Sequence, residues 1–490
     1  MLLSIDVSVL YLALPALSRD LGATNVEQLW IVDIYSFMLA GFLVTMGGLA
    51  DRIGRRRLMM YGAAAFGIAS TAAAFSPSAE ALIASRAVMG VAGATLMPTA
   101  LATIRQLFAG TRQLSSAIGA WFGCFMIGML LGPLIGGLLL DRFSWGAVFL
   151  IAVPVMGLLL TIGPRLLPES RDEAAGRLDA LSVVLSLGAL LPIAWAVKHI
   201  ARDGFKPGSI AVLAIGLLVG VAFVVRQRRV VSPLLDVSLF VNRAFSCALA
   251  ISAVGGIVMA GVSLVTAIYL QSVAGLSPFT AGLWLIPQNV AMIAGFTAAP
   301  AIAKRIAQHQ VIAGGLAIAA GGFALITQAN PSSFEIVLAG MAIASFGVAA
   351  PMALGANVLM SAAPEEKAAS AASIMETSGE LGVALGVASL GSLSVAAYRF
   401  ALRPELDRMP VDDVTKSAAV SGIEDAVQLA SELPPTIADA VQLAAREAFV
   451  SSVHTVATVA SATFVVLALT VIALLRADPR AAAGHKGSLA

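Results

Sequence analysis

Apolar runs of about 20 residues recur along almost the whole chain, with short polar breaks between them. A helix of that length spans the hydrocarbon core of a bilayer. The runs are continuous and rich in Gly and Ala, whereas the strands of a membrane barrel would alternate apolar and polar residues. With a mean hydropathy of +0.92 and only 12% charged residues, the sequence predicts an all-α integral membrane protein.

Fourteen apolar runs can be assigned as membrane spans. They cover residues 1–18, 30–50, 58–76, 80–104, 114–139, 145–164, 178–198, 208–226, 242–271, 279–303, 310–329, 333–361, 369–397 and 448–475. Lys and Arg are several times more frequent in the connections on one side of these spans. The short connections on the other side hold only Arg19, Arg142, Lys198, Arg202 and Lys206. The positive-inside rule makes the richer side cytoplasmic, and an even number of spans then places both termini in the cytoplasm.

Residues 398–447 form a long connection that is not membrane-like, and they lie on the external side. The stretches "DAVQLASE" and "DAVQLAARE" echo each other on either side of Pro434 and Pro435, which predicts two short amphipathic helices. Two interpretations remain open. The segment is either a helical cap over the external mouth or a solvated loop without a mechanistic role.

Composition disfavours several classes of protein. The formal net charge is +2 and the basic residues are spread over many loops, so no nucleic-acid partner is expected. Cys124 and Cys247 both lie in apolar spans, which disfavours a disulfide framework or a thiolate metal site. The four histidines form no metal-binding pair, and the sequence contains no Walker-type phosphate loop. We therefore expect no cofactor and no metal, and a proton gradient as the energy source for any transport.

The stretch "GGLADRIGRRR" connects the second and third spans on the cytoplasmic side. It resembles the loop motif of the major facilitator superfamily, and the matching residues are Gly47, Asp51, Arg52, Gly54, Arg55 and Arg56. The resemblance implies a conformational latch between two halves of a transporter. Asp51 would then bind the cytoplasmic start of the span 369–397, near Ala369, when the transporter faces outward. The alternative is that the arginines only anchor the topology.

The fifth span contains "GAWFGCFMIGMLLGPLIGG", which resembles the antiporter motif of exporters in this family. The motif residues are Gly119, Gly128, Gly132, Pro133, Gly136 and Gly137. Small residues on one face let two helices pack closely, and a Gly-Pro pair weakens a helix where a cavity must change shape. Glycine packing without a transport role is the alternative.

The fourth span contains "SRAVMGVAGA", which keeps the Arg and the Gly of a further family motif as Arg86 and Gly90, with Met89 in place of a Gln. Arg86 is the only basic residue placed inside a span, and a buried cation requires a partner or a function. Arg86 is expected either to act as a charge relay that tunes a nearby carboxylate or to form a purely structural ion pair.

The opening stretch "SIDVSVLYLALP" resembles the first-span signature of the fourteen-span drug:proton antiporter branch, matched by Asp6, Ala13, Leu14 and Pro15. "QLWIVDIYS" and "WGAVFLIAVP" strengthen the resemblance to the quaternary ammonium and multidrug exporters of that branch. The resemblance implies a major facilitator fold of two six-helix bundles plus two inserted helices. The implied divisions are a bundle at 1–165, a linker with the inserted pair at 166–235, a bundle at 236–476 that includes the loop 398–447, and a cytoplasmic tail at 477–490.

The thirteenth span contains "SIMETSGELGVALG", which places Glu376 and Glu380 on one face of a helix. Burial and mutual repulsion disfavour two charges there, as expected of groups that exchange protons near neutral pH. Together with Asp6 and Asp33 these residues would make the interior net negative, which suits a lipophilic cation that competes with protons. Two alternatives remain: a shallow position of the glutamates facing external water, and a helix-start role for Asp33.

A substrate site can also use aromatic, thioether and amide side chains, although packing against lipid or core explains such residues equally well. The candidates are Trp121, Phe122, Phe125, Met126, Met129, Trp284, Gln288 and Asn289.

The sequence therefore predicts a proton-coupled efflux antiporter of the bacterial inner membrane, active as a monomer, that exports lipophilic cations by alternating access and catalyses no covalent chemistry. The nearest alternative is an exporter of an endogenous solute, such as a lipid, peptide or siderophore, on the same scaffold. A membrane sensor or lipid-modifying enzyme is disfavoured because the sequence shows no soluble catalytic or signalling domain.

Overall fold

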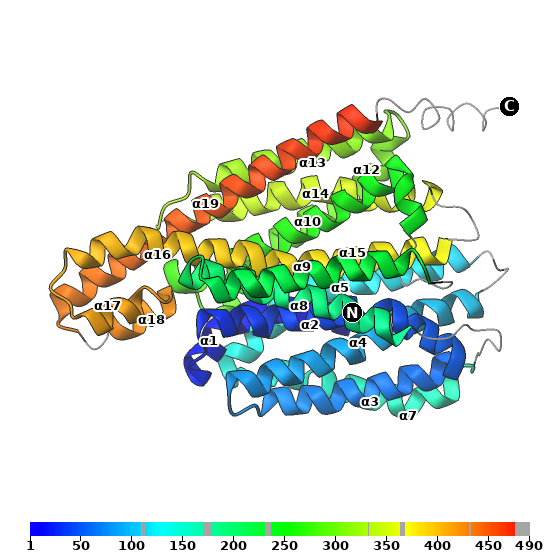
Figure 1. The fold of residues 1–490 in the computed structure, drawn as a ribbon, viewed down its shortest axis with the longest axis horizontal. Coiled ribbons are helices and arrows are strands. Elements are labelled where there is room, and N and C mark those ends of the chain that lie inside the picture. The colour runs from blue at the N-terminus through cyan, green and yellow to red at the C-terminus, as the bar shows by residue number, and fades with distance from the viewer. Residues whose placement is uncertain are drawn as a thin grey trace.

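The computed structural model describes residues 1–108, 111, 113–169, 179–230, 237–331, 333–362, 368–430 and 433–475. Within these ranges the chain is almost entirely helical and contains no strand. Most of the long helices run roughly along the long axis of the molecule (Figure 1). The predicted all-α membrane fold is therefore confirmed.

The first half of the chain supplies six predicted spans. Their helices are α1 (Leu2–Leu21), α2 (Asn25–Ile53), α3 (Arg55–Ala74), α4 (Ala79–Leu107), α5 (Leu114–Arg142) and, for the sixth span, α6 (Ala147–Leu150) with α7 (Ala152–Leu166). The inserted pair, α8 (Ala180–Asp203) and α9 (Pro207–Gln227), forms a hairpin. An ion pair ties the hairpin at the end predicted to be cytoplasmic, where Arg226 Nη2 lies 2.8 Å from Asp179 Oδ1.

The second half begins with a 3-10 turn, Val237–Val241. Its spans are α10 (Arg243–Ile268) with the π-helical turn Tyr269–Val273, α11 (Pro278–Trp284) with α12 (Ile286–Ala303), α13 (Gln308–Ile326), α14 (Phe334–Ala362), α15 (Ala368–Gly386), which continues through the π-helical turn Val387–Gly391 into α16 (Ser392–Asp407), and α19 (Pro435–Leu475). The break between α11 and α12 falls next to Pro287, which cannot donate a backbone hydrogen bond.

Each of the fourteen predicted spans corresponds to one of these helices or to consecutive helices. In the described part of the chain, 13 segments are long and apolar enough to cross a membrane. The one predicted span that is not among these 13 segments corresponds to α3, which begins with three arginines. Lys198 was assigned to the connection after the seventh span, which is wrong, because α8 continues past it to Asp203. No Gly or Pro lies between Pro192 and Gly204, so nothing in the sequence ends the helix earlier.

Buried apolar side chains form two large clusters, one mainly in α1–α7 and one mainly in α10–α19. The two halves come close at glycines. A Cβ atom on Gly137 of α5 would lie 2.6 Å from Phe279 Cα of α11, and one on Gly391 would lie 2.6 Å from Leu29 Cδ2 of α2. Both contacts lie toward the ends of the helices that the sequence predicts to be external, so the two halves pack directly against each other at that end.

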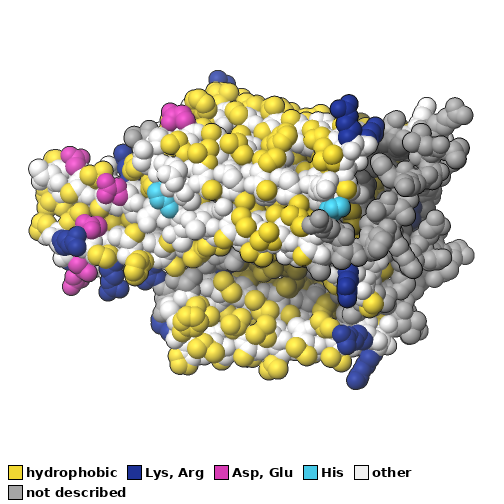
Figure 2. All heavy atoms as spheres, turned by 90° about the horizontal axis from the view of Figure 1, so that it is seen from above, with side chains coloured by type: hydrophobic (Ala, Val, Ile, Leu, Met, Phe, Trp, Pro, Cys, Tyr) yellow, Lys and Arg dark blue, Asp and Glu magenta, His cyan; other side chains and the backbone are white. Residues whose placement is uncertain are grey.

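The outer surface of the helices is apolar, as contact with lipid requires. On α9 the exposed side chains include Leu218 and Val221, which are 69% and 61% accessible. Figure 2 shows a broad apolar surface between the two ends of the molecule, with Lys and Arg side chains near both ends and acidic side chains mainly near the projecting end at the left. The inserted hairpin therefore presents much of its second helix to the membrane.

The segment 398–447, which the sequence predicts to be external, is a packed helical unit in its described part, and we call it the external cap. It consists of the outer part of α16, α17 (Asp413–Ala419), α18 (Ile423–Ala430) and the first turns of α19, which project beyond the other helices (Figure 1). The Tyr398 hydroxyl donates a hydrogen bond to the Ala419 carbonyl at 3.1 Å. The first predicted amphipathic helix is α18, whereas the second is the beginning of α19 and not a separate helix.

The glycine stripe of α5 predicts a specific sensitivity to larger residues. We expect Gly132→Leu to lower the free energy of unfolding by about 1–3 kcal/mol, because a side chain there would overlap Ser8 of α1. Thermal unfolding of the purified protein in detergent measures the effect. Gly123→Leu on the same helix is the control, since no atom lies within 4 Å of its added Cβ. Equal melting temperatures for the two variants would contradict this packing.

Candidate functional site

Arg86 of α4 and Asp6 of α1 form a buried ion pair inside the first half. Arg86 Nη1 lies 2.6 Å from Asp6 Oδ2, and the two side chains are 1% and 6% exposed. Arg86 Nε also donates to the Ile31 carbonyl at 3.2 Å, and its guanidinium lies 4.7 Å from the centre of the Tyr35 ring. Asp6 is thus the carboxylate beside Arg86, and its charge is already compensated.

Lys198 of α8 forms a second buried ion pair, with Asp33 of α2. Lys198 Nζ lies 2.7 Å from Asp33 Oδ2 and 2.9 Å from Oδ1, and both side chains are fully buried. The same ammonium lies 3.6 Å from the centre of the Trp30 ring, within the range of a cation–π interaction. Sequence reasoning missed this partner of Asp33. The uninterrupted helical stretch between Pro192 and Gly204 was the signal that could have placed Lys198 inside the span.

Glu376 and Glu380 lie on α15 of the second half and face the first half. Glu380 accepts a hydrogen bond from the Ser36 hydroxyl of α2 and lies near Tyr11 and Tyr35 of the first half. Among the described residues, neither glutamate has a Lys or Arg within ion-pair distance. The four predicted acids therefore separate into two that are paired with cations and two that are not.

The antiporter glycines pack α5 against α1, the helix that carries Asp6. Gly128, Gly132 and Gly136 face Ser4, Ser8 and Val9 of α1 in turn. The Ser4 hydroxyl also donates to the Phe125 carbonyl at 3.0 Å. The side-chain environments of Gly119 and Phe122 lie outside the described part. Close packing of α1 and α5 is therefore one effect of the motif.

Two of the residues predicted to form a latch, Gly54 and Arg56, contact the end of the first half. Arg56 Nη1 donates to the carbonyls of Pro164 and Leu167 at 3.2 and 3.3 Å, and Arg56 Nε lies 3.5 Å from Glu169 Oε2. Gly54 has φ +107°, and an added Cβ would lie 2.7 Å from Glu169 Cδ, so the position requires glycine. Arg52 is exposed. The side chains of Asp51 and Ala369, the predicted latch contact, lie outside the described residues.

The residues predicted to line a substrate site lie on different helices and do not surround a single cavity in the described part of the chain. Asn289 Nδ2 donates to the Met129 carbonyl at 3.5 Å, a contact between α12 and α5 that joins the two halves. Gln288 Oε1 is buried and has no hydrogen-bond partner among the described residues. Trp284 is 42% exposed and packs edge-on against Phe334 of α14, at 5.6 Å between ring centres. Trp121, Phe125 and Met126 are partly buried on α5.

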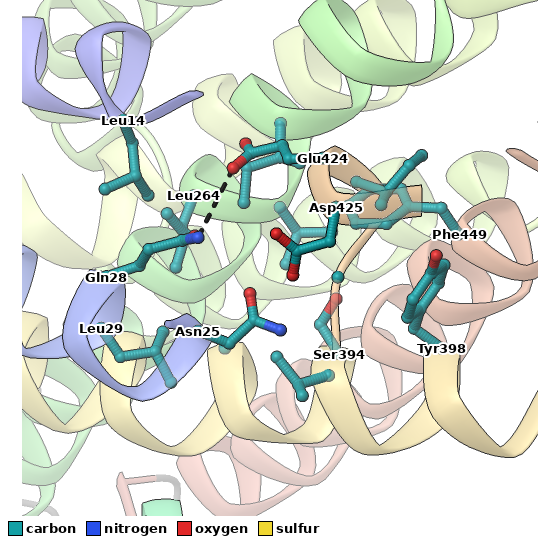
Figure 3. A pocket seen from close by; sticks show the side chains of 16 residues that line it. Leu14, Asn25, Gln28, Leu29, Leu264, Ser394, Tyr398, Glu424, Asp425 and Phe449 are labelled. Carbon is teal, nitrogen blue, oxygen red and sulfur yellow. Dashed lines mark hydrogen bonds between the residues drawn. The ribbon is translucent and has the colours of Figure 1, made fainter. Parts of the chain in front are cut away.

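A small pocket lies between the external cap and the outer ends of α1 and α2. Figure 3 shows Gln28 and Glu424 pointing toward each other, with the Asp425 carboxylate directed into the pocket near Asn25. Gln28 Nε2 donates to Glu424 Oε2 at 3.4 Å, while Glu424 Oε1 is buried and has no partner among the described residues. A volume of about 50 Å³ holds water molecules but not a drug-sized compound.

The sequence profile of the Major Facilitator Superfamily matches residues 1–387. The chain belongs to the major facilitator superfamily. This membrane transporter is 40% identical over 463 residues to the multidrug efflux pump LfrA of Mycolicibacterium smegmatis, a match that covers 94% of the chain and 91% of LfrA. It is also 36% identical over 459 residues to the methyl viologen resistance protein SmvA of Salmonella typhimurium, covering 93% of the chain and 91% of SmvA.

Solved structures agree on the fold of this major facilitator protein. A bacterial homologue of the human lysosomal transporter Spinster, in an inward-facing and unoccupied conformation, superposes with a TM-score of 0.66. The match covers 97% of the chain and 95% of that structure at 17% identity. A POT family transporter in complex with 5-aminolevulinic acid gives a TM-score of 0.60 at 14% identity, covering 96% and 95%. The chain is thus a multi-pass membrane transporter and not an enzyme.

The buried carboxyl of the cap predicts a pH-dependent attachment. The pKa of Glu424 is raised to about 7, chiefly by burial and also by the neighbouring charge of Asp425, while Ser18, Arg19 and Gln28 oppose this rise. The docked cap therefore favours protonated Glu424. Docking is strongest at acidic pH and weakens as the external pH rises through about 7.

Hydrogen exchange of α18 amides at pH 5.5 and 8.5 measures this dependence, after correction for the intrinsic effect of pH on exchange. We expect greater protection at the lower pH, and a smaller pH effect in Glu424→Gln, which mimics the protonated carboxyl. Glu405→Gln, which alters an exposed glutamate of the same cap, is the control. Equal pH dependence in the wild type and Glu424→Gln would show that this carboxyl does not govern docking.

Proposed function

We propose that this transporter is a proton-coupled multidrug efflux antiporter that exports lipophilic cations, including quaternary ammonium compounds and dyes, by alternating access. The observation that carries the proposal is the pair Glu376 and Glu380, which face the first half without a compensating Lys or Arg among the described residues. The names of the relatives support it. LfrA is a multidrug efflux pump, and SmvA confers resistance to methyl viologen, a quaternary dication.

Exchange of a cation for protons follows from the energetics of these two carboxylates. An unpaired carboxylate within a bilayer is costly, so it holds either a proton or another cation. A lipophilic cation loses little hydration on entry, because its charge is spread over an apolar surface. Proton entry from outside would displace the drug, and proton loss to the cytoplasm would restore affinity for the next cation.

Asp6 and Asp33 have other roles in this proposal. Their charges are compensated by Arg86 and Lys198, so neither binds a further cation without first releasing its partner. Arg86 would then act as a charge relay that compensates the Asp6 carboxylate while the glutamates exchange protons and cations. Glu376 and Glu380 are therefore the primary proton-coupling and cation-binding residues.

Alternating access would follow from rocking of the bundle 1–165 against the bundle 236–476, with residues 166–235 carrying the inserted hairpin. The close contacts of Gly137 and Gly391 on the external side correspond to a state closed to the outside. The latch around Asp51 would engage in the opposite state. The protein would act as a monomer in the inner membrane of a bacterium, with both termini in the cytoplasm.

Ethidium efflux from bacterial cells that lack their own dye pumps tests the proposal. We expect cells expressing the wild type to extrude the dye, an uncoupler to stop extrusion, and Glu376→Gln or Glu380→Gln to reduce it to background. Asp6→Asn should also reduce efflux, because it leaves the Arg86 charge uncompensated.

Glu335→Gln, an exposed glutamate at the start of α14, is the matched control and should leave efflux unchanged. Membrane abundance of every variant must be compared. If no cation is moved by any well-expressed form, the export of an endogenous solute replaces this proposal.

A further inference from the structure

The position of Lys198 is unusual for a lysine near the end of a membrane helix. It lies five residues before the last residue of α8, a distance of about 7 Å along the helix axis, so its ammonium could extend to the external water. Instead the side chain is buried and its ammonium contacts Asp33 and Trp30. Burying such a pair costs desolvation of both charges and is weak evidence for a gain in stability. The arrangement therefore calls for another explanation.

The two groups that hold the Lys198 ammonium are those that recognise organic cations in general. A carboxylate supplies charge, and the face of an indole ring binds ammonium and quaternary ammonium groups. Asp33 lies 2.7 Å from the ammonium nitrogen on one side, and the Trp30 ring centre lies 3.6 Å from it on another. Lys198 is thus bound as a cationic ligand would be, except that it is attached to the protein.

This place lies where three parts of the transporter meet. Phe37 of α2, Ala194 of α8 and Ala384 of α15 belong to one buried cluster around it. Along α2, the acidic side chains of Glu424, Asp33 and Glu380 follow one another at successive depths. Gln28 contacts Glu424 of the cap, Asp33 pairs with Lys198 one and a half turns deeper, and Ser36 contacts Glu380 about one turn further. A cation that leaves Glu380 toward the outside would therefore meet Asp33 next.

A cavity large enough for a drug borders Lys198 on the external side. It has a volume of about 430 Å³ and lies between the α1–α2 connection, α8, α16 and the cap. Its polar lining includes Asn25, Arg399 and Asp425. Lys198 therefore stands between this external cavity and the Asp33 carboxylate.

We propose that Asp33 and Trp30 form an exit subsite for organic cations, and that Lys198 occupies this subsite as a tethered competitor while the external side is closed. The inference rests on the proposed export of cations. A tethered ligand acts at an effective concentration in the millimolar range, so it excludes weakly bound cations without abolishing their passage. The inserted hairpin thus contributes a substrate-like cation to the transport path.

The test uses the purified full-length protein in lipid nanodiscs and the variants Lys198→Ala, Lys198→Ala/Asp33→Asn and Lys304→Ala. The last variant removes an exposed lysine at the cytoplasmic end of α12 as a control. Ethidium binding is measured by fluorescence. We expect Lys198→Ala to bind about tenfold more tightly than the wild type, and the double variant and the control to show no gain.

Thermal unfolding provides a second readout in case Lys198→Ala is destabilised. Methylammonium chloride should raise its melting temperature more than sodium chloride at equal concentration, and should have no such specific effect on the wild type or the double variant. A merely structural ion pair would give neither the gain in affinity nor this rescue. The inference is overturned if Lys198→Ala shows neither response, or if the double variant shows the same responses.

The outcomes separate this inference from the proposed function. If wild-type cells export ethidium but Lys198→Ala gains no affinity and no rescue, the subsite is wrong and the antiporter stands. If no form exports a cation while Lys198→Ala responds to methylammonium through Asp33, the subsite stands and the function must be revised.

Discussion

A charge left alone inside a bilayer is so unfavourable that its compensation determines how the first half of this transporter is assembled. Arg86 joins α4 to α1 through Asp6, and Lys198 joins α8 to α2 through Asp33. Both acids lie on the first two helices, and each cation comes from a later one. The uncompensated carboxylates, Glu376 and Glu380, lie on the opposite half. The interface between the halves is thus asymmetric, with paired charges on one face and titratable acids on the other.

The glycines serve the same interface by setting how closely backbones approach. Gly132 lets α5 contact α1 next to the helix face that carries Asp6, while Gly137 lets the other side of α5 contact α11. One helix therefore takes part both in the packing around an ion pair and in the contact between the two halves. This double contact gives the antiporter motif a physical meaning in a helix that borders both halves.

The sequence allowed the number of spans, the fold class and the family to be predicted, because hydrocarbon thickness fixes helix length and the loop motif is specific. It did not allow the partners to be predicted. Asp33 and Lys198 are 165 residues apart, and only tertiary packing brings them together. The end of α8 was also misjudged, since hydropathy falls before the helix ends. Pro434 and Pro435 do separate two helices as predicted, and Pro435 lies at the first position of α19, where a proline favours helix initiation. The sequence did not indicate that this second helix continues without interruption into the last span.

The length of α19 links the cap to the last span. Its 41 residues correspond to about 60 Å, roughly twice the hydrocarbon thickness, in one helix from the cap to the end of that span. Because no break separates the two parts, the first turns of the cap's closing helix and the last span are one continuous element. A tilt of the last span would therefore carry that part of the cap with it.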